Sequence, residues 1–267
     1  MSELLLSTNG LTKQYGHHKA VDKVNLHIKK GAIYGFIGRN GAGKTTCLKM
    51  ISGLARPTAG EIEMFGCKGK ELERIRSRVG CLIEAPGLYG NMNAYTNLKI
   101  KCELFGIRKK GYIEDILETV GLEGVGKKKT KHFSLGMKQR LGIGLALVGE
   151  PDLLVLDEPI NGLDPQGIAE VRDTIQRLRD ERNMTILISS HILEELSKIA
   201  TDYGIIHNGS LLQELTSEEL MKRCSERIEI ELIHPEQAVP ILDRMGFTNY
   251  QVCLLYTSPS PRDPKTS

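Results

Sequence analysis

The stretch GFIGRNGAGKTT, residues 35–46, constrains this chain more than any other part of its sequence. It places Gly38-x-x-x-x-Gly43-Lys44-Thr45 directly after an apolar run and before a helical pattern, which is the P-loop arrangement in the context it requires. Such glycines let the backbone turn tightly and aim its N–H groups at phosphate oxygens, and the following helix adds the positive end of its dipole. We therefore expect a nucleotide-binding turn here. A glycine-rich turn without a ligand is the alternative.

The residues of this turn have distinct expected roles. Lys44 reaches the β- and γ-phosphates and is a candidate catalytic residue, while the Thr45 hydroxyl is a hard oxygen ligand suited to Mg²⁺. ATP and Mg²⁺ are the expected cofactors. The candidate nucleotide-binding residues in this segment are Gly38, Arg39, Asn40, Gly41, Ala42, Gly43, Lys44, Thr45 and Thr46.

Two carboxylates and a histidine follow buried strands predicted further along the chain. LLVLDEP ends an apolar run with Asp157 and Glu158, and ISSHI places His191 after another. Strand ends of this kind meet at the carboxyl edge of an open α/β sheet, where ligands bind. We expect Asp157 to hold Mg²⁺ through water, Glu158 to act as general base on the attacking water, and His191 to contact the γ-phosphate. A solvated strand end and a structural histidine are the alternatives.

Alternating apolar runs and helical patterns predict an α/β fold with a P-loop core. The spacing of apolar residues predicts a helix over 165–182, with Asp164 as its N-cap, and another over 112–120. The stretch 86–149 is interpreted as a helical subdomain inserted into the core. AIYGFIG, DLLVLD and TILISS are typical of buried parallel strands, whereas EIEMFG and VNLHI suggest an antiparallel layer.

The end of the chain differs from the rest. We assign residues 1–225 to one domain and residues 226–252 to the start of a small C-terminal appendage, with a strand over 227–233 and a helix over 235–247. Residues 253–267, CLLYTSPSPRDPKTS, resemble a conceptual translation of a transposase adapter used in DNA sequencing libraries. We interpret them as a non-native tail on a truncated chain, with a natural disordered tail as the alternative.

Composition excludes several classes of protein. The net charge of +3 over 267 residues is too small to indicate a nucleic-acid partner, and the lysine-rich run 127–131 is typical of a solvated loop. No apolar run approaches the ~20 residues that span a bilayer, and no signal peptide is evident. The six cysteines lack a C-x-x-C pair, so free thiols in a cytoplasmic protein are expected.

The segment KHFSLGMKQR, residues 131–140, combines with the other motifs into a family resemblance. Ser134 is placed to cap a helix and Gly136 falls in its first turn. The P-loop, FSLGMKQR, LLVLDEP, NGLDP and SSHI occur in the order found in ABC-type ATPases, and the resemblance covers residues from about 4 to 225. It implies a two-lobed ATPase with an antiparallel β layer and a helical subdomain. It also implies that a second copy, or a paralogous ATPase, completes two ATP sites head to tail.

The resemblance also implies roles for residues outside the P-loop. Tyr15 stacks on adenine, with ordinary packing as the alternative. Ser134, Gly136 and Asp164 contact ATP or the partner across the dimer. Two departures stand out: Leu135 and Met137 alter the commoner Leu-Ser-Gly-Gly-Gln signature, and Glu84 replaces the usual glutamine in the loop that joins the core to the helical subdomain. A glutamate there can still ligate Mg²⁺ but adds negative charge beside ATP, unless it is only a surface acid.

Glu84 together with GRNGAGKTT, FSLGMKQRLGI and SSHIL resembles the subgroup tied to bacitracin resistance and lantibiotic self-protection. In that subgroup the ATPase works from the cytoplasmic face of the membrane with separate permease subunits that export peptide antibiotics. A soluble ABC mechanoenzyme and a nucleotide-dependent regulator without a transport role are the alternatives. The modest helical insert, without sustained heptads, disfavours a DNA-acting mechanoenzyme.

Overall fold

The computed structural model describes residues 3–223 and 235–246. Contacts group the chain into two units, Met1–Arg223 and Cys224–Ser267. In the second unit the described part consists of α8 (Pro235–Arg244) and two following residues, and α8 confirms the helix predicted over 235–247. The strand predicted over 227–233 and the tail at 253–267 lie outside the described residues.

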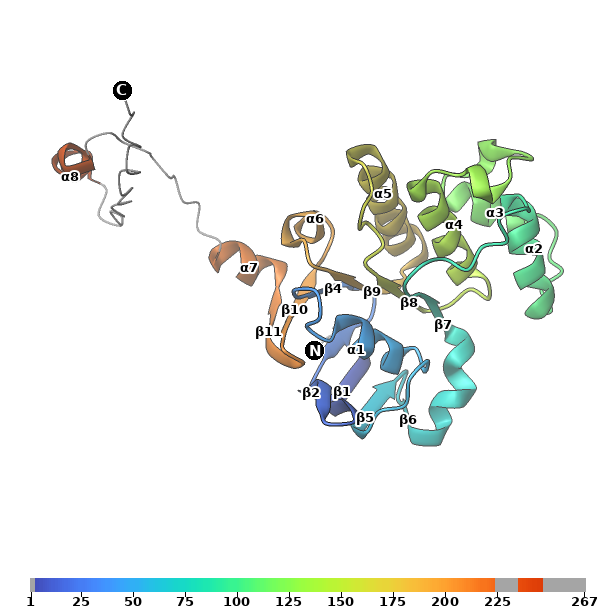
Figure 1. The fold of residues 1–267 in the computed structure, drawn as a ribbon, viewed down its shortest axis with the longest axis horizontal. Coiled ribbons are helices and arrows are strands. Elements are labelled where there is room, and N and C mark those ends of the chain that lie inside the picture. The colour runs from blue at the N-terminus through green and yellow to red at the C-terminus, as the bar shows by residue number, and fades with distance from the viewer. Residues whose placement is uncertain (1–2, 224–234, 247–267) are drawn as a thin grey trace, which may run out of the picture. The chain divides into compact units, whose positions relative to one another are not determined.

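Two β-sheets form the framework of the first unit (Figure 1). The larger has the order β11-β10-β4-β9-β8-β7 and is parallel except for β11, which runs antiparallel to β10. The smaller sheet is antiparallel, with the order β2-β1-β5-β6 and β3 also pairing with β1. The strands are β1 (Leu4–Tyr15), β2 (His18–Val24), β3 (His27–Lys29), β4 (Ile33–Ile37), β5 (Ala59–Met64), β6 (Cys67–Lys68), β7 (Val79–Leu82), β8 (Leu153–Asp157), β9 (Thr185–Ser190), β10 (Asp202–His207) and β11 (Ser210–Thr216).

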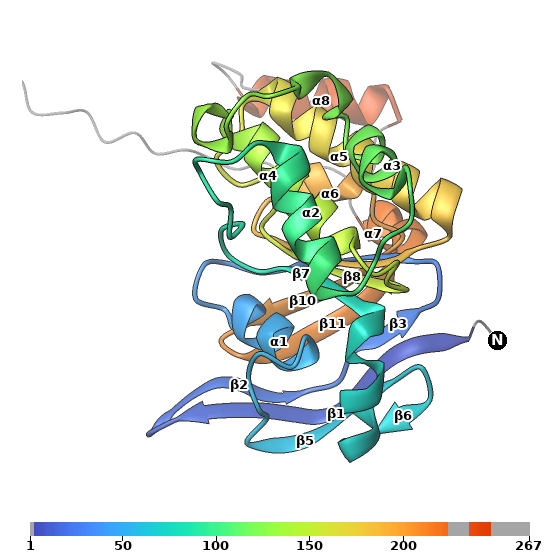
Figure 2. The ribbon, with the colours of Figure 1, turned by 90° about the vertical axis from the view of Figure 1, so that its right-hand side faces the viewer.

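Both faces of the larger sheet are covered. Successive side chains of its central strands point to opposite sides, so each of these strands contributes to two cores. Ile33 and Leu154 pack into one core with the helices that follow residue 93, whereas Tyr34 and Leu153 pack into a second core with α1 (Lys44–Ile51) and the smaller sheet. In Figure 2 α1 lies between the two sheets. Burial on both faces explains why β4, β8 and β9 are apolar along nearly their whole length. The predicted parallel strands are confirmed.

The predicted antiparallel layer is confirmed, but the boundary of one predicted strand was wrong. β5 covers EIEM, but VNLHI is divided, since β2 ends at Val24 and β3 begins at His27. Between them the Asn25 side chain accepts a hydrogen bond from the Gly10 N–H at 2.6 Å, and the Leu26 N–H donates to the Thr8 hydroxyl at 2.8 Å. Together with a backbone hydrogen bond from the Thr8 N–H to the Leu26 carbonyl at 3.0 Å, these side-chain bonds hold the segment where the strand is interrupted.

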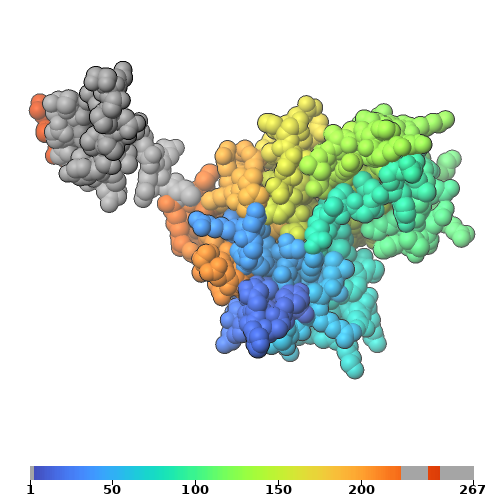
Figure 3. All heavy atoms as spheres, in the orientation of Figure 1, coloured from blue at the N-terminus to red at the C-terminus, as the bar shows by residue number. Residues whose placement is uncertain are grey.

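Three α-helices lie within the stretch predicted to be a helical insert. They are α2 (Ala94–Leu104), α3 (Tyr112–Thr119) and α4 (Leu135–Leu147), and two short 3₁₀ turns, Glu123–Val125 and Thr130–His132, lie between α3 and α4. In the space-filling view they form a lobe beside the layer that carries α1 (Figure 3). The remaining helical segments of the first unit are a 3₁₀ helix at Gly69–Arg78, α5 (Pro165–Arg182), α6 (Leu193–Ser197) and α7 (Ser217–Arg223).

Helix α5 begins and ends where the sequence predicts. The Asp164 side chain accepts a hydrogen bond from the Gly167 N–H at 3.2 Å, and Pro165 occupies the first turn. Val171, Ile175 and Leu178 are buried along one face. None of the helices within 3–223 and 235–246 combines the length and the apolar character that crossing a membrane requires.

We expect the central strand β8 to dominate stability. Leu154 is fully buried, so Leu154→Ala should lower the free energy of unfolding by about 3 kcal/mol, because it leaves a cavity. Leu212, 64% exposed on β11, is the matched control, and Leu212→Ala should cost less than about 0.5 kcal/mol. Urea unfolding of the two variants measures both values, and equal losses would contradict the assignment of the core.

Candidate nucleotide site

Three neighbouring strands bring the first group of site residues together. β4, β9 and β8 are adjacent and parallel, so their carboxyl ends share one edge of the larger sheet. The P-loop follows β4, His191 follows β9, and Asp157 and Glu158 lie at the end of β8. The convergence predicted from the sequence is therefore present at the edge where such sheets bind ligands.

The P-loop requires glycine for reasons of space as well as conformation. Gly43 has φ 105°, and a Cβ on it would lie 2.4 Å from the carbonyl oxygen of Ala20. A Cβ on Gly38 would lie 2.5 Å from the carbonyl oxygen of Ile206. The loop leads into α1, whose first N–H groups have no acceptor within the helix. Unpaired donors at a helix N-terminus favour an anion.

Lys44 is buried inside this turn, with 5% of its side chain exposed. Its ammonium group donates to the carbonyl oxygens of Gly38 at 2.6 Å and Arg39 at 3.2 Å. It also lies 3.0 Å from Oε1 of Glu158. The ammonium group is thus held between the loop and the carboxylate that follows β8.

Asp157 is the centre of a hydrogen-bonded group at the end of β8. Its Oδ2 accepts from the Thr45 hydroxyl at 2.8 Å, and its Oδ1 accepts from the Ser189 hydroxyl at 2.6 Å. The Ser189 oxygen in turn accepts from the Glu158 N–H at 3.0 Å. Ser189 therefore links the two carboxylate residues. The sequence analysis missed it, although a polar residue late in a buried strand is an available signal.

Glu158 occupies an unusual backbone conformation with φ 47°. Few residues other than glycine adopt this region, and exceptions gather at functional sites. Its Oε2 lies 2.9 Å from Nδ1 of His191. Its Oε1 is buried and, despite the ion pair with Lys44, has no hydrogen-bond partner among the described residues. Oε1 is thus a buried acceptor whose nearest charged neighbour is the Lys44 ammonium group.

The oxygen donors at Thr45 and Asp157 fit a magnesium ion. A hydroxyl and a carboxylate, already 2.8 Å apart, are both hard ligands of the kind Mg²⁺ prefers. Within the described parts of the chain no group of three or more His, Cys, Asp or Glu side chains is gathered for a metal. This matches the way Mg²⁺ is bound in phosphate-transfer sites, by one or two protein ligands together with substrate phosphates and water.

Glu84 follows β7 and pairs with a residue that the sequence analysis did not consider. Lys49 of α1 donates to its Oε1 at 2.5 Å. This hydrogen bond is the main cause that raises the pKa of Lys49 above its ordinary value. Burial opposes it as the next largest effect, and attraction to Glu84 and Asp157 adds smaller contributions that raise the pKa. Glu84 itself is 65% exposed and has φ 64°.

Tyr15 lies at the end of β1 and is 53% exposed. The ammonium group of Lys13 sits 5.1 Å from the centre of its ring. The ring is thus a solvent-accessible aromatic surface rather than part of the core.

A second group of predicted residues gathers where α4 and α5 begin, and these helices pack against each other (Figure 1). Ser134 caps α4, and its oxygen accepts from the Met137 N–H at 3.2 Å. A Cβ on Gly136 would lie 3.5 Å from the Cα of Gly167, in the first turn of α5 that Asp164 caps. Ser134 and Asp164 are therefore brought close by helix packing.

The two groups are separate within one chain. Among the described residues, no hydrogen bond or ion pair joins Ser134, Gly136 or Asp164 to Lys44, Thr45, Asp157, Glu158 or His191. Leu135, at the tip of α4, is 48% exposed, whereas Met137 packs partly on the core. The signature segment thus presents an open surface.

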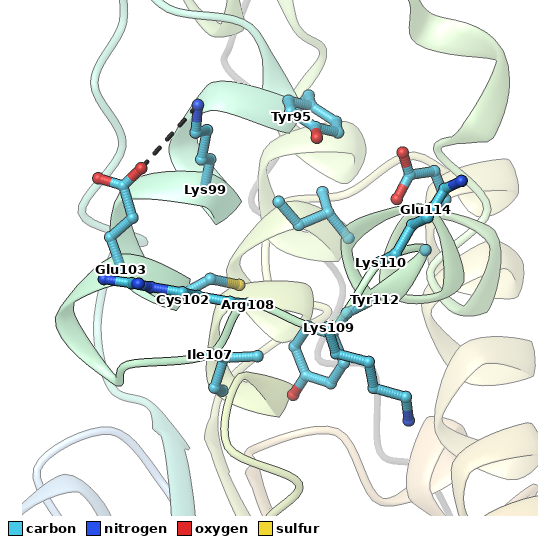
Figure 4. A pocket seen from close by; sticks show the side chains of 12 residues that line it. Tyr95, Lys99, Cys102, Glu103, Ile107, Arg108, Lys109, Lys110, Tyr112 and Glu114 are labelled. Carbon is cyan, nitrogen blue, oxygen red and sulfur yellow. Dashed lines mark ion pairs between the residues drawn. The ribbon is translucent and has the colours of Figure 1, made fainter.

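A cavity of about 620 Å³ lies elsewhere, between α2 and α3 (Figure 4). Tyr95, Lys99, Cys102, Ile107 and Tyr112 are among its lining residues. None of the predicted site residues lines it.

The chain belongs to the ABC transporter family, whose model matches residues 21–161. The bacitracin transport ATP-binding protein BcrA of Bacillus licheniformis is 49% identical over 241 residues, covering 90% of this chain and 79% of that protein. The lantibiotic transport ATP-binding protein SrtF of Streptococcus pyogenes is 44% identical over 211 residues, covering 79% of this chain and 90% of that protein.

Solved structures agree with the fold. An ATP-binding subunit of an ABC transporter matches with a TM-score of 0.72 at 28% identity, covering 89% of this chain and 99% of that chain. An ATP-binding cassette in its ADP conformation matches with a TM-score of 0.74 at 25% identity, covering 83% and 94%. The predicted fold class and the ABC-type resemblance are confirmed, and the chain is an ATP-binding ABC ATPase.

The Ser189 bridge yields a stability prediction. Ser189→Ala removes a fully buried hydroxyl and leaves the Glu158 N–H and one Asp157 oxygen unpaired, so the free energy of unfolding should fall by about 1–3 kcal/mol. Ser197→Ala, which removes an exposed hydroxyl bonded to the Glu194 carbonyl, should cost about 0.5 kcal/mol or less. Denaturant unfolding measures the free energy of unfolding of both variants. A Ser189→Ala protein as stable as the control would refute the role of Ser189 in linking Asp157 and Glu158.

Proposed function

We propose that this protein is the ATP-hydrolysing subunit of a bacterial ABC exporter of peptide antibiotics of the bacitracin or lantibiotic type. It works at the inner face of the membrane on separate permease subunits. The support is its similarity to relatives that are named bacitracin and lantibiotic transport ATP-binding proteins. The alternatives, a soluble mechanoenzyme or a regulator without a transport role, have no such support.

The single observation that carries the mechanism is the separation of the two residue groups. One group, around the P-loop, offers the donors and carboxylates of a phosphate site. The other lies at a second helix N-terminus, where Ser134 and Leu135 are exposed and no phosphate loop of the same chain is bonded to them. A head-to-tail dimer of this chain, or a pair with a paralogous ATPase, completes both sites.

In this proposal the residues around the P-loop bind and hydrolyse ATP. Lys44 exchanges its carbonyl contacts for β- and γ-phosphate oxygens, and residues 38–46 surround the phosphates with N–H groups. Oε1 of Glu158 accepts a proton from the attacking water, while His191 orients the carboxylate and contacts the γ-phosphate. Thr45 and Asp157 would hold Mg²⁺, which when bound neutralises negative charge on the phosphates. Glu84 contributes an oxygen near that ion.

The remaining predicted residues act on either side of the dimer. Tyr15 offers its exposed ring to the adenine base. Ser134 and Gly136 contact the γ-phosphate held by the partner, and Asp164 lies at the contact between the copies. Hydrolysis removes the group that both copies hold, so the dimer opens. The loop that contains Glu84 passes this motion to the permease.

Removing the general base should trap the ATP-bound state. Glu158→Gln should lower the rate of phosphate release at least ~100-fold, because the amide cannot accept the proton of water. The same variant should elute as a dimer with ATP in size-exclusion chromatography. Glu103→Gln, at an exposed position of α2, is the control and should hydrolyse ATP normally. A Glu158→Gln protein that remains monomeric with ATP contradicts the sandwich dimer for the isolated chain.

A substitution of Gly136 tests the group of residues around Ser134 without disturbing the fold. A Cβ there meets only ordinary contacts, at 3.5 Å and 4.0 Å, so Gly136→Ala should leave stability unchanged or raise it by up to about 1 kcal/mol. The methyl group would pack against Leu163 and Gly167 of the same chain, so it would shift the start of α4 relative to the partner and should weaken ATP-dependent dimerisation and cooperative hydrolysis. Gly124→Ala adds a methyl group in open space outside this surface and should change neither property. Normal dimerisation of Gly136→Ala would remove this surface from the site.

The cargo is tested in cells. Co-expression with the membrane genes that neighbour this gene should raise survival on bacitracin or lantibiotic peptides, and Glu158→Gln should abolish the gain. Survival that does not depend on Glu158, or unchanged sensitivity across a panel of peptides, would refute peptide export.

A further inference from the structure

The ion pair between Lys49 and Glu84 lies near the nucleotide site, and none of the roles proposed above uses it. Lys49 lies four residues after Thr45 on α1, so both side chains project from one face of this helix, one turn apart. Glu84 approaches from the loop after β7 and accepts a hydrogen bond at 2.5 Å through Oε1. The pair therefore joins the helix behind the P-loop to the segment that leads into α2.

The charges around this pair affect the affinity for ATP. Lys49 also feels the negative charge of Asp157, whose Oδ2 is bonded to Thr45, so it belongs to the same charged neighbourhood as the phosphate site. A bare carboxylate at Glu84 would repel the strongly negative triphosphate, and glutamine at the same position would not. Charges in partly exposed positions a few ångströms apart interact strongly enough to change affinity several-fold.

We propose that Lys49 is a positioning residue that neutralises the Glu84 carboxylate and holds its loop against α1, which allows a glutamate at this position beside ATP. The inference rests on the proposed function, since it assumes that ATP binds at the P-loop. Among the described contacts Oε2 of Glu84 makes no hydrogen bond, so the pair occupies one carboxylate oxygen and leaves the other for a ligand. Lys44 differs from Lys49 in bonding the loop backbone directly.

The test is a double-mutant cycle on ATP binding without hydrolysis. Affinity for a fluorescent ATP analogue is measured in EDTA and in Mg²⁺ for the wild type, Lys49→Gln, Glu84→Gln and the double variant. In EDTA, Lys49→Gln should weaken binding about tenfold when Glu84 is present, because it removes a positive charge and also releases the Glu84 carboxylate to approach the triphosphate. In the Glu84→Gln background only the charge is lost, so the loss should be less than about threefold. Mg²⁺ should reduce the larger loss, because a cation then offsets the bare carboxylate.

Two further variants separate charge from folding. Lys49→Arg keeps the positive charge and should bind ATP within about twofold of the wild type. Lys68→Gln breaks a comparable ion pair on the smaller sheet, with Glu63 at 3.0 Å, and should leave ATP binding unchanged. If Lys49→Gln does not fold, Glu84→Gln alone is informative, since it frees Lys49 and should raise metal-free affinity about threefold.

The outcomes are distinct. Equal losses from Lys49→Gln in both backgrounds, or an unchanged or lower metal-free affinity in Glu84→Gln, would overturn the inference while leaving the ATPase intact. A wild-type protein that binds no ATP analogue would instead refute the proposed function. The expected pattern is a loss that depends on Glu84 and is rescued by arginine.

Discussion

The parallel pairing of β4, β9 and β8 is the constraint on which the rest of the site depends. Because the three strands are adjacent and run in one direction, the P-loop, His191 and the carboxylates of Asp157 and Glu158 meet at one edge. Each strand is held by burial on both faces, between α1 and the helices of the insert. The cost of burying polar groups there is offset by mutual hydrogen bonds, of which Ser189 supplies two.

An incomplete site follows from the same architecture. Next to Lys44 the first N–H groups of α1 have no acceptor within the helix, and Oε1 of Glu158 remains a buried acceptor without a hydrogen bond among the described residues. The start of α4 presents Ser134 and the exposed Leu135 on a different lobe. In the proposed dimer, a triphosphate between two copies contacts both surfaces.

In the Lys49–Glu84 pair, a lysine on α1 compensates the charge of the glutamate at position 84. A carboxylate in place of an amide adds charge to a site that already contains Asp157 and Glu158, and a lysine one helical turn beyond Thr45 supplies the opposite charge. The pair also connects α1 to the loop before α2, which is the segment that leads into the helical insert.

The sequence by itself determined the elements and the chemistry of the first site. Local patterns are enough for this, because a P-loop, a buried strand ending in acids and the capped helix from Pro165 each report on a few neighbouring residues. The division of VNLHI between two strands, the Ser189 bridge and the Lys49–Glu84 pair were decided only by the tertiary structure. Each joins residues far apart in the chain, and no local periodicity encodes which side chains a fold will bring within hydrogen-bonding distance.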